Sequence, residues 1–302
     1  MLHLERSIYM EVLRATNLTK IYGSTIAVNN VSMTINEGDI YGFVGENGAG
    51  KTTFIRLVAG LADKNSGEFT LFEGENHSIG ALVETPSLYL YLNAMDNLMA
   101  QGKLLGITDK EKHKELFRLV KLEYLIDSKK KAKSFSLGMK QRLGIAMCLL
   151  ANPKFLLLDE PMNGLDPEGV VLMRDLIKSL SEQGITFLIS SHMLGELSKV
   201  ATRYGFIHEG KLIKEITREE LEQSQKGLLN VKVSEENVEK LKIVLTKNNI
   251  KFDDEDGIKI YDQTIEDIVE LLTKNGITLK GITEETSNIE DYYLDLIGGL
   301  HE

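Results

Sequence analysis

The chain has 302 residues, of which 42% are hydrophobic and 26% are charged, and its single cysteine excludes an intramolecular disulfide. These proportions are those of an ordinary globular protein of roughly two domains, and no apolar stretch approaches the ~20 residues that span a bilayer. The formal net charge of −10 is concentrated in residues 210–302, which carry 12 Lys and Arg against 21 Asp and Glu. An acidic segment on a nearly neutral body argues against nucleic acid as a partner.

The first predicted elements are strands, and Met10, which opens them, is the expected natural start. Residues 12–39 alternate apolar and polar side chains, which predicts an antiparallel β element. Short apolar runs at 40–45, 155–159 and 185–190 predict buried strands, and each is followed by a helix-periodic stretch, at 51–60, 167–183 and 193–200. Buried strands that alternate with helices indicate an α/β fold with a mostly parallel sheet.

A different segment interrupts this pattern. Residues 93–150 are predicted to form a helical insertion, in which Leu116, Leu119 and Val120 give a helix at 109–122 one apolar face. Cys148 lies in its apolar part and is expected to be a core residue rather than a nucleophile. We assign residues 10–215 to one domain, with a helical subdomain at about 86–152.

The last part of the chain, residues 216–302, is predicted to be a small acidic accessory domain of α+β class. Strands are expected near 228–233, 257–262 and 277–283, and helices at 235–247 and 264–275. Its charge is explained either as a solvated face or as a surface that helps to hold or gate a dimer.

The stretch "GENGAGKTT" at 45–53 predicts a phosphate-binding loop, because Gly45, Gly50, Lys51 and Thr52 match the pattern G-x-x-x-x-G-K-[ST]. Glycines let the backbone N–H groups wrap a phosphate, and the following helix adds its positive end. Lys51 is expected to reach the β- and γ-phosphates and Thr52 to bind Mg²⁺. The remaining residues of the expected nucleotide contact are Glu46, Asn47, Gly48, Ala49 and Thr53.

A second motif, "KFLLLDEP", ends an apolar strand with two carboxylates, Asp159 and Glu160. Side chains alternate along a strand, so the two are expected to point to different sides. Asp159 suits Mg²⁺ binding, and Glu160 is then free to orient or deprotonate an attacking water.

With these motifs in place, residues 11–215 resemble the ATP-binding cassette of ABC transporters, a P-loop NTPase fold. The segment "SFSLGMKQR" is similar to the family's L-S-G-G-Q signature, with Ser136 and Gly138 kept and Phe135, Leu137 and Met139 substituted. Ser136 is also a good N-cap for the next helix. The resemblance implies that this helix end binds an ATP molecule held by a second subunit.

The resemblance also implies roles for four isolated residues. Tyr22 occupies the position where the family stacks an aromatic ring on adenine, and Val28 is expected to flank the base. Asp166, in "NGLDP", belongs to the dimer-interface loop, and His192, in "SSH", is expected at the γ-phosphate. Lys51, Glu160 and His192 are therefore the predicted catalytic residues.

One position departs from the family pattern. Glu84 stands where the family carries a glutamine that links Mg²⁺ and the γ-phosphate to the membrane partner. A carboxylate also binds Mg²⁺ well, so Thr52, Glu84 and Asp159 form the predicted metal set. Three sequence segments, "IGALVETPSLY", "SLGMKQR" and "NIEDYYLDLIGG", resemble the corresponding segments of the bacitracin- and lantibiotic-type export subfamily.

The resemblance implies an ATPase that uses ATP and Mg²⁺ to power export of a peptide antibiotic, bacteriocin or drug. Its partners are then a second copy or a paralogous subunit, and an integral membrane permease. Its expected location is cytoplasmic, peripheral on the inner face of the membrane. The alternative is a non-transport ABC ATPase that acts as a regulatory module. Two other classes of ABC ATPase are disfavoured. A translation factor normally has two cassettes in one chain, and this chain has one. A chromosome ATPase has long coiled coils or a basic face, and neither is predicted here.

Overall fold

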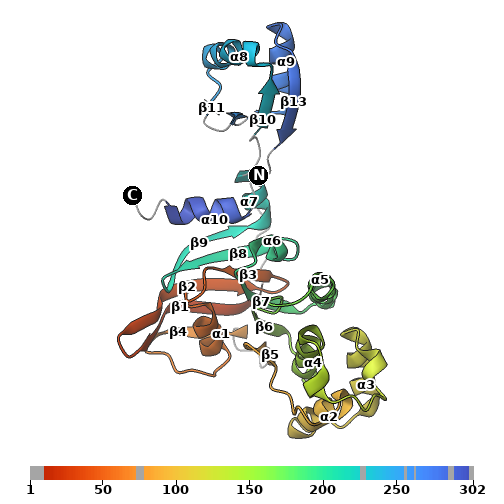
Figure 1. Ribbon diagram of the computed structural model, residues 1–302. Helices are drawn as coiled ribbons and strands as arrows, with labels where there is room; N and C mark the ends of the chain where they lie inside the picture. Colours follow the sequence, from red (N-terminus) through yellow and green to blue (C-terminus); the bar gives the residue numbers. More distant parts are fainter. Residues whose placement is uncertain are drawn as a thin grey trace, which may run out of the picture. The chain divides into compact units, whose positions relative to one another are not determined.

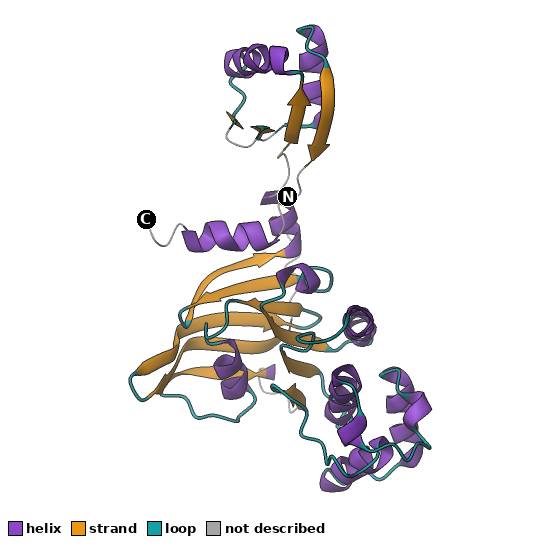
Figure 2. Ribbon diagram, in the orientation of Figure 1, coloured by secondary structure: helices purple, strands orange, loops and turns teal. Residues whose placement is uncertain are grey.

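The computed structural model describes residues 10–72, 78–224, 229–254, 257–261, 263–284 and 289–298 (Figures 1 and 2). Its internal contacts divide the chain after Thr217 into two units, and each is described by itself. Met10 is the first described residue, and the nine residues that precede it lie outside the described part.

A six-stranded sheet with the order β5-β6-β7-β3-β8-β9 forms the centre of the first unit. Its strands are β3 (Ile40–Val44), β5 (Ile79–Leu82), β6 (Phe155–Asp159), β7 (Thr186–Ser191), β8 (Arg203–His208) and β9 (Lys211–Thr217). All neighbouring strands are parallel except β8 and β9. Every residue of β3, β6 and β7 is buried, which explains why these strands are continuous apolar runs in the sequence.

The predicted antiparallel element forms a second sheet with the order β2-β1-β4. Its strands are β1 (Glu11–Tyr22), β2 (Thr25–Asn36) and β4 (Ser66–Leu71). Helix α1 (Lys51–Val58) buries Phe54 and Ile55 in one hydrophobic core with residues of β1, β3 and β6. The rings of Phe43 and Phe54 lie 5.2 Å apart. This core fixes the start of α1 relative to both sheets.

The predicted helical insertion is present and consists of α2 (Ala94–Leu104), α3 (Lys110–Leu119), α4 (Leu137–Leu149) and two short 3₁₀ turns (Glu123–Leu125 and Ala132–Ser134). Figure 1 shows α2, α3 and α4 gathered together beside strand β5. Within the predicted helix at 109–122, Phe117 and Val120 are fully buried, whereas Leu119 is only partly buried. The chain returns to the sheet from α4 into β6, and α5 (Pro167–Glu182) and α6 (Leu194–Leu197) then connect β6 to β7 and β7 to β8.

The second unit begins with α7 (Arg218–Ser224) and ends with α10 (Ile289–Gly298). Between them lie β10 (Leu229–Val233), α8 (Glu235–Lys247), β11 (Phe252–Asp253), β12 (Ile258–Ile260), α9 (Ile265–Lys274) and β13 (Leu279–Glu284). The four strands form an antiparallel sheet in the order β11-β12-β10-β13. A βαββαβ chain with this strand order has the ferredoxin-like topology.

The fold class is therefore the predicted one, an α/β cassette followed by a small α+β unit. None of the helices in the described ranges is long and apolar enough to cross a membrane.

Candidate nucleotide site

The loop between β3 and α1 has a backbone that only glycine adopts easily. Gly50 has φ +107°, and a Cβ there would lie 2.3 Å from the Ala27 carbonyl oxygen of β2. Gly48 also has a positive φ of +86°, but nothing lies within 4 Å of its Cβ position. The loop is therefore packed against the protein on one side and open on the other, the arrangement that a phosphate cradle needs.

Lys51, the first residue of α1, points back into this loop. Its side chain is 5% exposed, and its Nζ donates to the carbonyl oxygens of Gly45 at 2.6 Å and Glu46 at 3.0 Å. The Glu160 Oε1 atom lies 3.3 Å from the same nitrogen. An ammonium group has three donors, so these contacts hold the positive charge at the mouth of the loop.

Thr52 joins the loop to the end of β6. Its Oγ1 lies 2.8 Å and 3.1 Å from the two carboxylate oxygens of Asp159. Asp159 is 3% exposed and also accepts a hydrogen bond from Ser190 Oγ at 2.6 Å. A buried carboxylate held by two hydroxyls keeps a fixed direction.

A carboxylate and a hydroxyl fit Mg²⁺, because this ion usually takes one or two protein oxygens and completes its shell with phosphate and water. The described ranges contain no cluster of three or more His, Cys, Asp or Glu suited to a metal. Thr52 and Asp159 are the pair that could hold the ion beside bound phosphate.

Glu160 has a φ of +50°, in the left-handed region, where a non-glycine residue is uncommon. Its N–H donates to Ser190 Oγ at 3.0 Å. Its Oε2 atom lies 2.8 Å from His192 Nδ1 and 3.3 Å from the backbone nitrogen of His192. Because a carboxylate only accepts, Nδ1 carries the proton, and Nε2 can donate only when the ring is doubly protonated.

The structure thus brings Lys51, Thr52, Asp159, Glu160 and His192 together at the carboxyl ends of β3, β6 and β7. This edge is where ligands bind in open parallel sheets.

Glu84 does not join this cluster. Its only polar side-chain contact in the described structure is an ion pair with Arg56 of α1, at 2.6 Å. The predicted metal set of Thr52, Glu84 and Asp159 is therefore not assembled, and Glu84 points to the second turn of α1 instead.

The two residues expected at the base differ in exposure. Tyr22 is 46% exposed, and the Lys20 ammonium lies 4.9 Å from its ring centroid. Val28 is fully buried in the hydrophobic core, and its contact with a base stays a prediction. The neighbouring residue Ala27 is the one whose carbonyl oxygen lies against the loop at Gly50.

The signature segment and the following interface loop both form helix starts. Ser136 accepts a hydrogen bond from the Met139 N–H at 3.3 Å and caps α4. Asp166 accepts one from the Gly169 N–H at 2.9 Å and caps α5, with Pro167 in its first turn. Ser136 and Asp166 are exposed, and Gly138 is partly exposed. These residues lie outside the Lys51 cluster and face solvent.

Two side-chain contacts of predicted site residues were not predicted from the sequence. Ser190 holds both the Asp159 carboxylate and the Glu160 N–H, and Arg56 holds Glu84. The serine pair that precedes His192 at the end of an apolar strand was the only available signal for Ser190, because polar residues there are otherwise unexpected.

Comparison with known proteins agrees with this geometry. Residues 28–163 match the sequence family described as ABC transporter. The chain is 41% identical over 305 residues to the bacitracin transport ATP-binding protein BcrA of Bacillus licheniformis, covering 95% of this chain and 98% of that protein. It is 44% identical to the lantibiotic transport ATP-binding protein SrtF of Streptococcus pyogenes, over 68% of this chain and 90% of that protein.

A solved structure shows the same architecture. The ADP-bound ATP-binding cassette MJ1267 of an ABC transporter matches with a TM-score of 0.62 at 27% identity, over 70% of this chain and 93% of that chain. A relative aligned over nearly its entire length, together with the assembled phosphate loop, identifies the family. The chain belongs to the ABC transporter family, in which it is an ATP-binding subunit and an ATPase.

Proposed function

We propose that this chain hydrolyses ATP to power an exporter of peptide antibiotics, bacteriocins or drugs, as one half of a dimer that closes on two ATP molecules. The main support for this proposal is the arrangement of side chains around Glu160. Lys51 and His192 both contact the Glu160 carboxylate, and the hydrogen-bonded pair Thr52–Asp159 lies beside it. The substrate class rests on relatives whose names specify the transport of bacitracin and of a lantibiotic.

Lys51 binds the terminal phosphates of ATP in this account. Two of its three donors are taken by the carbonyl oxygens of Gly45 and Glu46, which leaves the third for a phosphate oxygen in place of Glu160. Thr52 and Asp159 would hold Mg²⁺, which would supply positive charge to the phosphate oxygens. A contact of the ion with Glu84 requires that carboxylate to leave Arg56.

Glu160 accepts the proton of the attacking water while the water oxygen bonds to the γ-phosphorus and the bond to ADP breaks. Its carboxylate is already oriented by two contacts with His192. A positioned base of this kind typically supplies a factor of ~10²–10⁴ in rate. When its ring is doubly protonated, His192 also donates from Nε2 to the γ-phosphate.

A second copy completes the site. The start of α4, with Ser136 and Gly138, offers N–H groups and a positive helix end on an accessible surface. In the proposed dimer these groups bind the γ-phosphate held by the other copy, and Asp166 lies at the interface. Binding of two ATP molecules then shifts the population from open to closed dimers, and hydrolysis reverses the shift.

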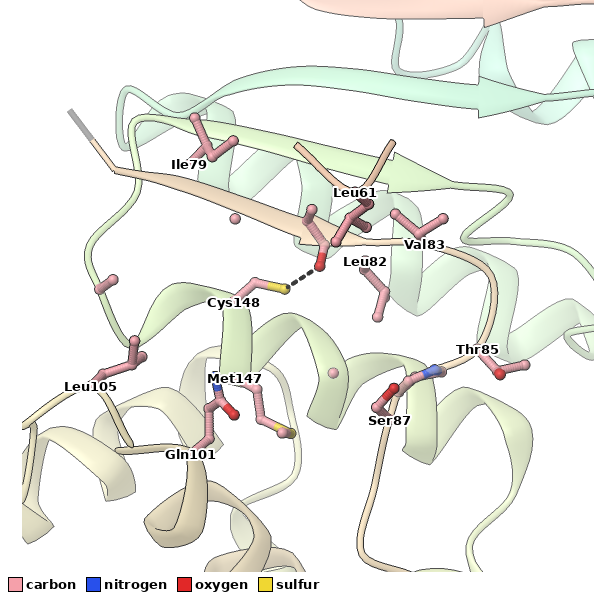
Figure 3. Close-up of a pocket in the computed structure, with 15 residues that line it drawn as sticks. Leu61, Ile79, Leu82, Val83, Thr85, Ser87, Gln101, Leu105, Met147 and Cys148 are labelled. Atoms are coloured by element: carbon pink, nitrogen blue, oxygen red, sulfur yellow. Dashed lines mark hydrogen bonds between the residues drawn. The ribbon is translucent and has the colours of Figure 1, made fainter. Parts of the chain in front are cut away.

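The permease is proposed to dock on a pocket of about 370 Å³ between β5 and the helices α2 and α4 (Figure 3). Its apolar lining includes Leu61, Leu82 and Met147, and its rim carries Thr85 and Ser87. Burial raises the pKa of the Cys148 thiol to about 12, so this residue contributes a neutral, unreactive surface.

Exposed aromatic residues follow the lining residue Ser87 along the chain. Tyr89 is 55% exposed and Tyr91 is 79% exposed, in the segment that runs from the pocket to α2. Apolar and aromatic side chains gathered next to a concave site are typical of a protein interface. A chain that docks there would be held at the inner face of the membrane.

An affinity purification from gently solubilised native membranes tests the proposal. We expect the tagged chain to bring down one multi-spanning membrane protein in stoichiometric amount, and Tyr91→Glu to reduce its recovery. A matched control, Tyr124→Glu, changes an aromatic residue that is 60% exposed in the 3₁₀ turn Glu123–Leu125, outside the segment that joins the pocket to α2, and should retain the partner. Recovery with ribosomes, with DNA or without a partner would favour the non-transport alternative.

A further inference from the structure

The ion pair between Arg56 and Glu84 links the phosphate-binding helix α1 to the segment that follows β5. Arg56 lies on α1, four residues after Thr52, and therefore on the same side of the helix as the predicted metal ligand. Glu84 follows β5, whose last residue, Leu82, pairs with Leu158 of β6. The guanidinium–carboxylate contact of 2.6 Å thus ties the phosphate-binding helix to the chain that leaves β5.

The chain after β5 has few conformations available to it. Glu84 has a φ of +59°, in a region that side-chain-bearing residues rarely adopt. Thr85 precedes Pro86, which restricts Thr85 to extended conformations. Because Glu84 and Thr85 are both restricted, the segment has little freedom to bend, and a displacement of Glu84 is expected to move the residues after it as well.

Beyond Glu84, this segment meets the helical insertion. A Cβ placed on Gly144 of α4 would lie 2.9 Å from the Pro86 ring, which shows how closely Pro86 packs on that helix. Thr85, Pro86 and Ser87 also line the pocket to which we assign the permease. The same helix, α4, begins at the signature residue Ser136.

We propose that Arg56 is a positioning residue that couples the phosphate-binding helix α1 to the Glu84–Pro86 segment, and through it to α4 and the docking pocket. This inference rests on the proposed function, because it assigns a regulatory contact to the same site. Nucleotide bound in the phosphate loop reduces the mobility of α1. The ion pair with Arg56 then reduces the mobility of Glu84 and of the Glu84–Pro86 segment, which lines the surface where a partner binds.

The expected size of the coupling follows from the exposure of the pair. The Arg56 and Glu84 side chains are 39% and 60% exposed, and exposed pairs of this kind change an equilibrium by about two- to fivefold. The pair Lys114–Glu111 on α3 has similar exposure, 38% and 70%, and a 2.8 Å contact. It provides a matched control, because it touches neither α1 nor the Glu84–Pro86 segment.

Hydrogen exchange measured by mass spectrometry tests the coupling, with ADP in EDTA as the probe so that no metal competes for Glu84. In the wild type, ADP should slow exchange in peptides covering 45–53 and also, by about two- to fivefold, in peptides covering 83–89. In Arg56→Gln the protection at 45–53 should remain, and the response at 83–89 should fall below about 1.5-fold. Arg56→Lys should restore part of it, and Lys114→Gln should behave as the wild type.

The outcomes separate the inference from the function on which it rests. An undiminished response at 83–89 in Arg56→Gln, with 45–53 protected, overturns the coupling and leaves the ATPase intact. Absence of ADP protection at 45–53 in the wild type, both in EDTA and with Mg²⁺ added, removes the proposed function, and the inference with it. Arg56→Gln is expected to melt within about 3 °C of the wild type, since it loses only an exposed pair.

Discussion

The two units of the chain differ in whether they bury polar and charged side chains. Within the described ranges, all the buried polar and charged side chains belong to the first unit, among them Lys51, Asp159 and Ser190. The second unit has an apolar core that includes Leu229, Leu241 and Ile268, and its charges lie at the surface. Some of these buried polar residues of the first unit, such as Lys51 and Asp159, lie at the nucleotide site, where the usual exclusion of polar groups from the interior is given up to bind a ligand. Others, such as Asn97 and Arg142, lie in the helical insertion.

The comparison also concerns the residue types that adopt positive φ, since in the described part of the second unit the non-glycine residue of this kind is Asn249, and asparagine tolerates this region better than glutamate. Glu84 and Glu160, each in the left-handed region, follow β5 and β6 at the edge of the core sheet. Strained residues persist only where the surroundings fix them, and they concentrate at functional sites. The βαββαβ unit follows its amphipathic pattern throughout, so its structure alone assigns it no chemistry.

The largest expected effect is on hydrolysis. Glu160→Gln should lower the rate of phosphate release by about 10²–10⁴-fold, because the amide cannot accept the proton of the attacking water. ATP binding, measured by calorimetry, should persist, since Lys51 keeps its two carbonyl contacts. Glu236→Gln, in the first turn of α8 in the second unit, is the control and should hydrolyse at the wild-type rate. Wild-type turnover in Glu160→Gln would contradict our assignment of the base.

A pair of core substitutions sharpens the division between the units. Leu188 of β7 and Leu241 of α8 are both fully buried, and Leu→Ala at such sites costs about 2–5 kcal/mol of unfolding free energy. Leu241→Ala should raise hydrogen exchange across 229–284 and leave ATP hydrolysis within about twofold. Leu188→Ala should also weaken ATP binding, because β7 carries Ser190. Equal losses of hydrolysis in both variants would show that the units do not work separately.

The smallest effect concerns pH and a partly buried group, Tyr41 with Glu215 and Arg203, in the first unit. Tyr41 donates a hydrogen bond of 2.8 Å to Glu215 of β9. Burial raises the pKa of Glu215 above its ordinary value, against the hydrogen bond from Tyr41 and the charge of Arg203. The folded chain therefore holds this proton to higher pH than the unfolded chain, and the resulting stability is present at low pH and lost as pH rises through the folded pKa.

Replacing Glu215 by Gln removes this titration and keeps an oxygen that accepts from Tyr41. Urea unfolding at pH 4.5 and pH 7 should show a smaller loss of unfolding free energy on raising the pH in Glu215→Gln than in the wild type. A larger loss in the variant would mean that the carboxylate is stabilised rather than penalised by its surroundings.

Much of the fold was predictable because its signals are local. The runs at 40–45, 155–159 and 185–190 are apolar throughout, and strands covered on both faces must have this pattern. The phosphate loop is likewise a contiguous motif whose glycines are needed by its own backbone.

The remaining features depend on pairings between distant strands. Ser190 reaches Asp159 because β6 and β7 align these two residues directly, and single-chain patterns do not contain that register. The full burial of Val28 also depends on such pairings, because β1 and β2 shift register on both sides of Lys20. The strand order of the second unit, with β10 between β12 and β13, is non-local for the same reason.

The most direct test of the account is the molar mass of Glu160→Gln measured by light scattering during gel filtration. With ATP and Mg²⁺ the variant should elute as a dimer, at twice the 33.8 kDa of one chain, and with ADP as a monomer. Adding Ser136→Arg, which places a cation-bearing side chain at the exposed cap of α4, should abolish the dimer. A monomer under all conditions, with ATP bound, would contradict the claim that two copies close on the nucleotide.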